Sequence, residues 1–353
     1  MSIQTMRSFK VTAFGQPLQE VVAPLPEPRG AEVLVRVSAC GVCHSDLHLW
    51  DGHFDLGGGQ KMDLSKGLNL PRTLGHEIVG TVVAVGPDAT EAKPGDRRVV
   101  FPWIGCGECA LCAAGNEHLC NRPRGLGTSL DGGFADHVLV PHERYLVDFE
   151  GLREELACTY ACSGLTAYSA IRKAGTITER DPLLIVGAGG VGLAAVRLAR
   201  ALTGVPPIVA EIDRGKWDAA RAAGAGEVVD PSDPDARKAL LKATGGVAAA
   251  IDFVGAQASF EFGLAALRKG GTLIVVGLFG GSSTLSLPLL PLRAVGIVGS
   301  YVGSLAELRE LVDLAKAGHV QEIPVQTRSL DGVQQALDDL KGGRVVGRAV
   351  VKP

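Results

Sequence analysis

The pattern of apolar and polar positions changes character near residue 160. Before that point, β-branched runs at 32–38 and 78–85, separated by Gly, Pro and Asp, predict short strands. The segment 51–70 is polar and rich in glycine, which predicts a long loop. From residue 182 onward, apolar strands alternate with helical segments, as is typical of a doubly wound parallel sheet. We therefore expect an α/β protein with a β-rich first part and a parallel-sheet second part.

Composition excludes several classes of protein. The 353 residues are 46% hydrophobic and 21% charged, which indicates a globular chain and not a disordered one. The net charge of −3, with no long basic run, argues against nucleic-acid and anionic-membrane partners. No apolar stretch approaches the roughly 20 residues of a membrane span. Residues 1–10 lack the apolar core of a signal peptide, so we expect a cytoplasmic protein.

Four of the eight cysteines fall within fifteen residues and predict a structural zinc site. Zinc prefers four thiolates at tetrahedral corners, and x₂ spacings let a short loop fold around the ion. Because all four positions are filled by protein, the site is expected to be structural and not catalytic. Cys40 and Cys158 are interpreted as buried apolar residues. The predicted ligands are Cys106, Cys109, Cys112 and Cys120.

A glycine-rich turn at 187–192 follows an apolar strand and opens a helix, which is the pattern of a dinucleotide-binding turn. Glu211 ends the next strand, nineteen residues after the last glycine, where an acid would accept hydrogen bonds from the adenosine ribose. An acid there disfavours a 2′-phosphate, so NAD is predicted over NADP. Asp213 is an alternative acid, and Arg214 would weaken the preference. The predicted turn residues are Gly187, Gly189, Gly190, Val191 and Gly192.

Cys43, His76 and Cys162 form a second candidate zinc set. Two cysteines, one histidine and an open fourth position make a catalytic zinc site, where a bound alcohol or water is acidified. Each residue alone is more often an ordinary core residue. Their presence beside the four-cysteine loop and the glycine turn favours the zinc interpretation.

With these motifs together, the sequence resembles the zinc-dependent medium-chain alcohol dehydrogenase family along nearly its whole length. The resemblance rests on GVCHSDLH (41–48), GHE (75–77), the four-cysteine loop, CSGLT (162–166), GAGGVG (187–192) and VGRAVV (346–351). It implies a GroES-like catalytic domain at 1–160, with the structural zinc loop at 105–121. It also implies a Rossmann NAD-binding domain at 161–300 and a return to the catalytic domain at 301–353. The closest branch is tetrameric, so a homotetramer is expected, with a homodimer as the alternative and 296–301 as the contact edge.

The resemblance also assigns roles to individual residues. Cys43, His76 and Cys162 would hold the catalytic zinc, with Glu77 as an occasional fourth ligand. Asp46 would orient His76, and Ser45 and His48 would relay the alcohol proton to solvent. The expected cofactor contacts are His44 and Arg348 at the pyrophosphate, Thr166 behind the nicotinamide, Leu278 at the carboxamide, Val254 at the adenine and Lys216 beside Glu211 at the ribose.

Trp50, Phe54 and Trp103 are expected to line the substrate cleft, although plain core packing is an alternative for all three. An aromatic lining predicts apolar primary or secondary alcohols, whether medium-chain, cyclic or aromatic, and their aldehydes or ketones. A polyol or amino-alcohol dehydrogenase of the same family is the first alternative. A non-catalytic binding or scaffold protein is the second, since fold alone does not establish activity. A scaffold would not need the complete set of predicted zinc ligands together with Ser45 and His48.

Overall fold

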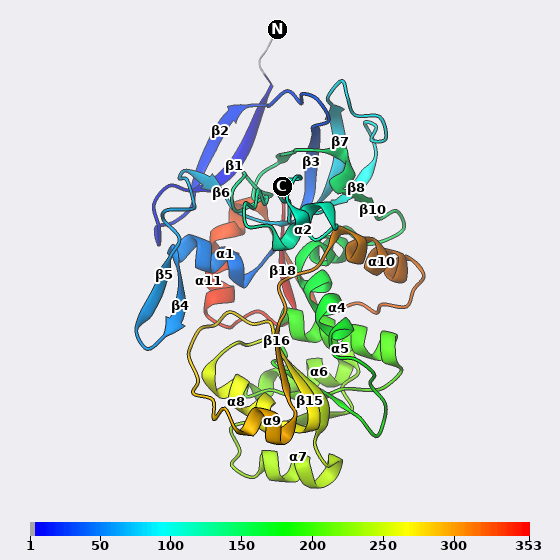
Figure 1. The fold of residues 1–353 in the computed structure, drawn as a ribbon. Coiled ribbons are helices and arrows are strands. Elements are labelled where there is room, and N and C mark those ends of the chain that lie inside the picture. The colour runs from blue at the N-terminus through cyan, green and yellow to red at the C-terminus, as the bar shows by residue number, and fades with distance from the viewer. Residues whose placement is uncertain (1–3) are drawn as a thin grey trace.

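The computed structural model describes residues 4–353 (Figure 1). Most of the strands fall into two large sheets, one built from both ends of the chain and one from its middle. Among the described residues, no helix has the length and apolar character needed to cross a membrane. The helices are α1 (His44–Asp51), α2 (Ala110–Ala113), α3 (Glu154–Thr159), α4 (Leu165–Arg172), α5 (Gly190–Thr203), α6 (Trp217–Ala223), α7 (Ala236–Thr244), α8 (Gln257–Ala266), α9 (Leu289–Arg293), α10 (Leu305–Lys316) and α11 (Val333–Lys341).

The first large sheet contains the predicted strands of the N-terminal half and is completed by the C-terminus. Its order is β10-β8-β7-β3-β18-β17, with β9 also paired to β3. Phe101, Phe134 and Phe149 are fully buried in this part of the molecule. The strands are β3 (Val33–Val42), β7 (Glu77–Val85), β8 (Arg97–Val100), β9 (His137–Val140), β10 (Leu146–Asp148), β17 (Val325–Ser329) and β18 (Arg348–Lys352). A smaller sheet joins β1 (Thr5–Val11), β2 (Gln19–Pro24) and β6 (Arg72–Thr73).

The second large sheet is entirely parallel, as the alternation of strands and helices predicts. Its order is β13-β12-β11-β14-β15-β16, which matches the 3-2-1-4-5-6 order of a Rossmann sheet. β11, the first strand of this sheet in chain order, is fully buried because helices cover both faces of the sheet. The strands are β11 (Leu183–Val186), β12 (Ile208–Ala210), β13 (Glu227–Val229), β14 (Val247–Asp252), β15 (Leu267–Val275) and β16 (Gly296–Gly299).

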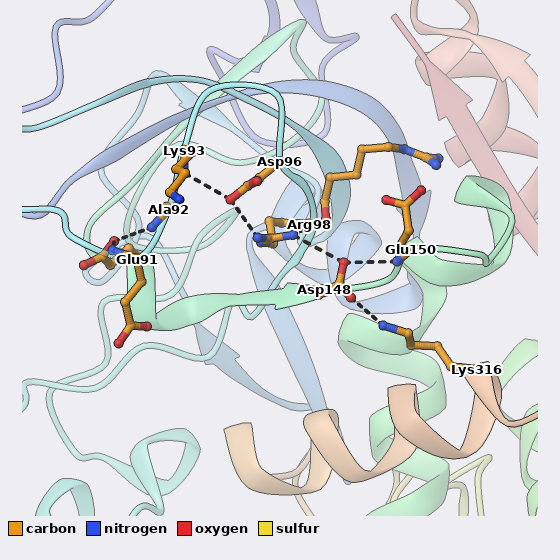
Figure 2. Close-up of polar contacts among 10 residues, drawn as sticks. Glu91, Ala92, Lys93, Asp96, Arg98, Asp148, Glu150 and Lys316 are labelled. Carbon is orange, nitrogen blue, oxygen red and sulfur yellow. Dashed lines mark hydrogen bonds and ion pairs between the residues drawn. The ribbon is translucent and has the colours of Figure 1, made fainter.

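Ion pairs fasten α10 to the first sheet (Figure 2). Asp148 at the end of β10 accepts hydrogen bonds from Arg98 of β8 at 3.3 Å and from Lys316 at the end of α10. Arg98 also donates to Asp96 at 2.7 Å. The hydrogen bond from Lys316 is the largest cause that lowers the pKa of Asp148. The segment that follows the Rossmann sheet is thereby held against the N-terminal part of the molecule.

The prediction of a long loop at 51–70 is wrong in part. Residues His53–Gly57 (β4) and Gln60–Asp63 (β5) pair as an antiparallel hairpin. The Asp55 Oδ1 atom accepts from the backbone N–H of Gly57 at 2.7 Å, and Gly57, Gly58 and Gly59 all have positive φ. The glycines that suggested a loop therefore form the turn of a hairpin, since glycine adopts positive φ without steric cost.

Candidate active site

Cys43, His76 and Cys162 converge on one buried point. Their ligand atoms all lie within 4.8 Å of one another, and all three residues are buried. Within the described residues, neither ring nitrogen of His76 has a hydrogen-bond partner that meets normal geometry. A buried imidazole whose Nε2 atom has no hydrogen-bond partner, beside two cysteine sulfurs, is the arrangement expected of zinc ligands. The three residues come from segments far apart in the sequence, and the fold brings them together.

Asp46 ties two of these segments together. Cys43 is the N-cap of α1, and its backbone N–H donates to Asp46 Oδ2 at 2.8 Å. The Asp46 Oδ1 atom accepts from the backbone N–H of Gly75 at 3.2 Å and lies 3.2 Å from His76 Nδ1. A carboxylate next to Nδ1 leaves Nε2 free to bind a metal and fixes the ring orientation. Asp46 is fully buried and so serves both as the helix cap and as the partner of the histidine.

Cys162 lies in an irregular helical segment. A π-helical turn, η3 (Tyr160–Gly164), is inserted between α3 and α4. Such turns are rare and occur most often at functional sites. The indole N–H of Trp103 donates to the Ala161 carbonyl at 2.9 Å, next to Cys162. This hydrogen bond fastens the turn to Trp103.

Glu77 lies beside the metal set and is held by two partners. Its Oε2 atom is 2.5 Å from Arg348 Nη2, and its Oε1 atom accepts from the backbone N–H of Ser163 at 3.0 Å. Burial raises the pKa of Glu77, while the charge of Arg348 opposes that rise. The predicted occasional zinc ligand is therefore paired with the predicted pyrophosphate contact.

The electrostatics of the site favour a thiolate at Cys43 and neutral side chains at His44 and His48. A hydrogen bond from the Cys162 thiol, outweighing the effect of burial, holds the pKa of Cys43 well below its usual range. Burial lowers the pKa of His44 and of His48 below the ordinary histidine value. The Cys43 sulfur lies 3.8 Å from the Ser45 hydroxyl. At neutral pH the structure thus presents a metal-binding sulfur and an unprotonated His48.

A cavity of about 630 Å³ runs from the metal set to the glycine turn, a volume within the ordinary range of ligand sites. Asp46, His76 and Glu77 are buried outside its lining. The other predicted metal, proton-relay and cofactor residues of this region all line it: Cys43, His44, Ser45, His48, Cys162, Thr166, Gly187, Gly189, Gly190, Val191, Gly192, Glu211, Lys216, Val254, Leu278 and Arg348.

The glycine turn has the close contacts that its sequence predicts. A Cβ on Gly192 would lie 1.9 Å from the Gly187 carbonyl oxygen, so only glycine lets α5 approach β11 this closely. A Cβ on Gly189 would meet nothing within 4 Å, which leaves that backbone open toward the cavity. Arg348 packs on the same turn, because a Cβ on Gly190 would lie 2.4 Å from its Cδ.

Glu211 follows β12 as expected, but both of its carboxylate oxygens have backbone partners. They accept from the N–H groups of Ala188 at 2.6 Å and Asp213 at 2.8 Å. Lys216 Nζ lies 3.4 Å from Asp213 Oδ2. In this structure Glu211 braces the glycine turn, a role that its position in the sequence does not reveal.

One of the three predicted cleft aromatics lines the cavity, and two do not. Trp103 does, with its ring 5.2 Å from the ring of His76. Trp50 is buried, donates to the Gln16 carbonyl and packs under Lys341, which fits the alternative of plain core packing. Phe54 is also outside the lining; it lies on the hairpin strand β4, with its ring 4.7 Å from the ring of His48.

Sequence reasoning missed Tyr301 and Phe279, both of which line the cavity. The Tyr301 ring is 5.8 Å from that of Trp103, and the Phe279 ring is 5.4 Å from that of His44. Both residues follow the carboxyl end of a parallel strand, where ligands bind in open α/β sheets. That position was the available signal.

The four-cysteine loop also folds into a site. The sulfurs of Cys106, Cys109, Cys112 and Cys120 all lie within 4.8 Å of one another. The Cys109–Cys112 and Cys109–Cys120 distances are 3.4 and 3.8 Å. Four sulfurs bound tetrahedrally to zinc would be separated by about 3.8 Å, given a Zn–S bond of about 2.3 Å. The backbone N–H groups of Cys106 and Arg122 each donate to Cys120 Sγ at 3.3 Å.

Comparison with known proteins agrees with this architecture. Residues 29–150 match the family model of the alcohol dehydrogenase GroES-like domain, and residues 190–317 match that of the zinc-binding dehydrogenase. The NAD-dependent alcohol dehydrogenases of Sulfurisphaera tokodaii and Saccharolobus solfataricus are 36% and 37% identical to this chain. Each alignment covers 99% of this chain and 100% of the relative. The crystal structure of the alcohol dehydrogenase from Aeropyrum pernix has a TM-score of 0.88 and 32% identity, covering 98% of this chain and 100% of that one.

The fold and the two metal-binding sets therefore define a zinc-dependent dehydrogenase. More specifically, the chain belongs to the zinc-dependent medium-chain alcohol dehydrogenase family. The predicted fold class, enzyme class and cofactors, NAD and zinc, are confirmed.

Proposed function

We propose that this enzyme transfers hydride reversibly between NAD and an apolar primary or secondary alcohol, giving an aldehyde or ketone. The observation that carries the proposal is the continuity of one cavity from the Cys43–Cys162 pair to the glycine turn. A bound alcohol and a nicotinamide ring could both occupy it, which is what hydride transfer requires.

The residues present fit both groups. Two cysteines, a histidine whose Nε2 atom has no hydrogen-bond partner and an open cavity side suit a catalytic zinc. The open Gly189 backbone, the N-terminus of α5 and the buried Arg348 guanidinium suit a pyrophosphate. Zinc held there would supply Lewis-acid polarisation of the alcohol oxygen, and NAD would supply the hydride acceptor.

We assign the proton to Ser45 and His48. The Ser45 hydroxyl lies next to Cys43 at the metal end of the cavity, and His48 lies one helical turn further along α1. A histidine whose pKa is lowered by burial is unprotonated at neutral pH and can accept a proton. Asp46 would hold His76, and Thr166, Leu278, Val254 and Lys216 would contact the cofactor along the lining.

The substrate pocket would be apolar on one side. Trp103 and Tyr301 stand edge to face beside the metal set, which favours medium-chain, cyclic or aromatic alcohols over polyols.

We also propose the domain division at 1–160, 161–300 and 301–353. The last segment supplies β17 and β18 to the first sheet, which supports its return to the catalytic domain.

We further propose a homotetramer built through the edge strand β16, or a homodimer through the same edge. Val298 of β16 is 40% exposed, and the nearby Leu287 and Leu292 are 72% and 67% exposed. An exposed apolar edge of this kind favours pairing with a second copy. Light scattering of the purified enzyme tests the assembly.

We propose a cytoplasmic location. The reducing cytoplasm would keep the eight cysteines reduced, as the two zinc sites require.

The first test follows NADH absorbance with ethanol, hexanol, 2-butanol, cyclohexanol, benzyl alcohol and glycerol, with a chelator-treated control. Chelator-sensitive turnover that favours cyclic or benzylic alcohols supports the proposal. Turnover of glycerol alone would support the polyol alternative. No turnover in a preparation with both zinc sites filled would count against the proposed substrate class.

A further inference from the structure

The hairpin β4–β5 touches the Rossmann part of the molecule through backbone atoms. Figure 1 shows the hairpin extending from the N-terminal part toward the yellow and orange segment after β15. A Cβ built on Gly57 would lie 2.4 Å from the carbonyl carbon of Gly281 and 2.5 Å from the nitrogen of Ser282. A Cβ on Gly280 would lie 2.7 Å from the carbonyl oxygen of Asp55. The two backbones approach so closely only because neither carries a side chain there.

The contacted segment is also part of the cavity wall. Leu278 and Phe279 line the cavity immediately before Gly280, although both side chains are substantially exposed. On its other side the segment is held by hydrogen bonds from Phe279 N to the Val254 carbonyl at 3.1 Å and from Gly280 N to the Gly255 carbonyl at 3.0 Å. The segment therefore lies between the β14–α8 connection and the hairpin.

The hairpin reaches the proton-relay side as well. Phe54 of β4 lies 4.7 Å from the His48 ring, and Phe279 lies 5.4 Å from the His44 ring. One hairpin thus contacts both α1 and the segment after β15, on the two sides of the cavity.

We propose that Gly57 is a positioning residue whose backbone contact with Gly281 and Ser282 holds Leu278 and Phe279 in place for cofactor binding. This inference rests on the proposed location of NAD in the cavity. Without the contact, two apolar side chains would have to be ordered when NAD binds, which weakens affinity.

The chain offers a closely matched control. Gly57 and Gly59 both have φ of +79°, so alanine is strained to a similar degree at either position. A Cβ on Gly59, however, meets nothing within 4 Å. A difference between Gly57→Ala and Gly59→Ala therefore reports the contact with the Rossmann segment and not the turn conformation.

The experiment measures the Kd for NADH by fluorescence, the KM for NAD and kcat in the zinc-loaded enzyme. We expect Gly57→Ala to raise Kd and KM about tenfold with kcat changed less than about twofold, and Gly59→Ala to change none of them by more than about twofold. Hydrogen exchange should be faster over 277–283 in Gly57→Ala alone. Equal Kd values for the two variants, or unchanged exchange over 277–283, would overturn the inference.

A second pair covers the case in which Gly57→Ala does not fold. Gly280→Ala introduces the clash from the other side, and Gly95→Ala, with φ of +98° and open surroundings, is its control. The same outcomes apply to this pair. Failure of the wild-type enzyme to bind NADH would instead refute the proposed function, so the two failures are distinguishable.

Discussion

The carboxylate of Glu77 and the guanidinium of Arg348 lie 2.5 Å apart and are almost completely buried. Glu77 begins β7, next to the proposed metal ligand His76, whereas Arg348 begins β18 and packs on the glycine turn. A single ion pair therefore connects the metal end of the site with its cofactor end. Each charge depends on the other, because an isolated buried charge is strongly unfavourable.

Replacing Arg348 should be costly for stability. Arg348→Met leaves Glu77 buried without its partner, and we expect the free energy of unfolding to fall by about 3–5 kcal/mol. Lys352→Met is the matched control: it removes a cation from the same strand, but its ion pair with Glu155 is only partly buried, and ion pairs that remain in contact with solvent contribute about 0–1 kcal/mol. Urea denaturation measures the free energy of unfolding of both variants. Equal losses would show that the buried ion pair contributes no more to stability than the pair of Lys352 with Glu155.

Asp46 should govern zinc affinity without being a ligand. Asp46→Asn keeps the size of the side chain but removes the charge beside His76 Nδ1, and zinc should bind about 10–100-fold more weakly. Competition with a zinc chelator gives the affinity directly. The exposed Asp88→Asn variant should bind zinc like the wild type. An unchanged affinity in Asp46→Asn would mean that the backbone alone orients the histidine.

The two metal sets should be separable. Cys109→Ser removes one of four sulfurs from the loop at 106–120, so zinc content should fall from two to one per chain, with a lower Tm. Cys158→Ala changes a buried cysteine outside both sets and should retain both ions. Metal analysis after dialysis tests this. Two zinc ions in Cys109→Ser would contradict the assignment of the loop.

Substrate preference should respond to Trp103 and not to Trp50. Trp103→Ala enlarges the cavity beside the metal set, and we expect kcat/KM to shift toward bulkier alcohols by about 10–200-fold. Trp50→Phe alters a tryptophan outside the cavity lining and should leave the ranking of alcohols unchanged. The ranking across the alcohol panel is the measurement, and the same order in both variants would place the substrate elsewhere.

Glu143 should make stability depend on pH. Its buried carboxylate accepts backbone N–H bonds from Thr90, Glu91 and Ala92 at 2.8, 2.7 and 2.7 Å. Burial raises the pKa of Glu143, but these donors outweigh burial and the net shift is downward. The ionised Glu143 carboxylate therefore stabilises the folded protein fully above the unfolded-state pKa of 4.5. This stabilisation is lost as the pH falls through the lower pKa of the folded state.

The variant that tests this is Glu143→Gln. It replaces one carboxylate oxygen with an NH₂ group, which would face the backbone N–H donors that the carboxylate binds in the wild type. We expect a loss of about 1–3 kcal/mol at pH 7 and a flatter dependence of stability on pH below 4.5. Glu91→Gln, at an exposed position, should change neither quantity appreciably. Identical pH curves for Glu143→Gln and wild type would remove Glu143 as the cause.

Local signals explain what the sequence predicts well. The spacing of Cys106, Cys109, Cys112 and Cys120 and the glycine turn at 187–192 lie within short segments, so their chemistry can be recognised without the fold. The parallel sheet follows from the alternation of apolar strands with helices. The sequence leaves the place of Trp50 open, because an aromatic residue near the catalytic motif can face either the cavity or the core.

Tertiary relationships explain most of what the sequence does not predict. The contact of Gly57 with Gly281 joins residues that are neighbours only after the two parts of the chain assemble. The bracing of Ala188 by Glu211 depends on a side-chain direction that position in the sequence does not determine. Tyr301 follows the edge strand β16, and its place at the cavity can be inferred only once the position of β16 in the sheet is known.

The place of β18 has a consequence for biosynthesis. It lies between β17 and β3, the strand that leads into Cys43, yet it is formed by Arg348–Lys352 near the end of the chain. At about 5–20 residues per second, roughly 15 to 60 s separate the synthesis of Val42 from that of Lys352. During that interval the candidate metal-binding cysteines of the nascent chain are already synthesised, but the sheet beside Cys43 still lacks β18. The Rossmann sheet, formed from one continuous stretch, can assemble first and serve as the surface on which the catalytic half closes.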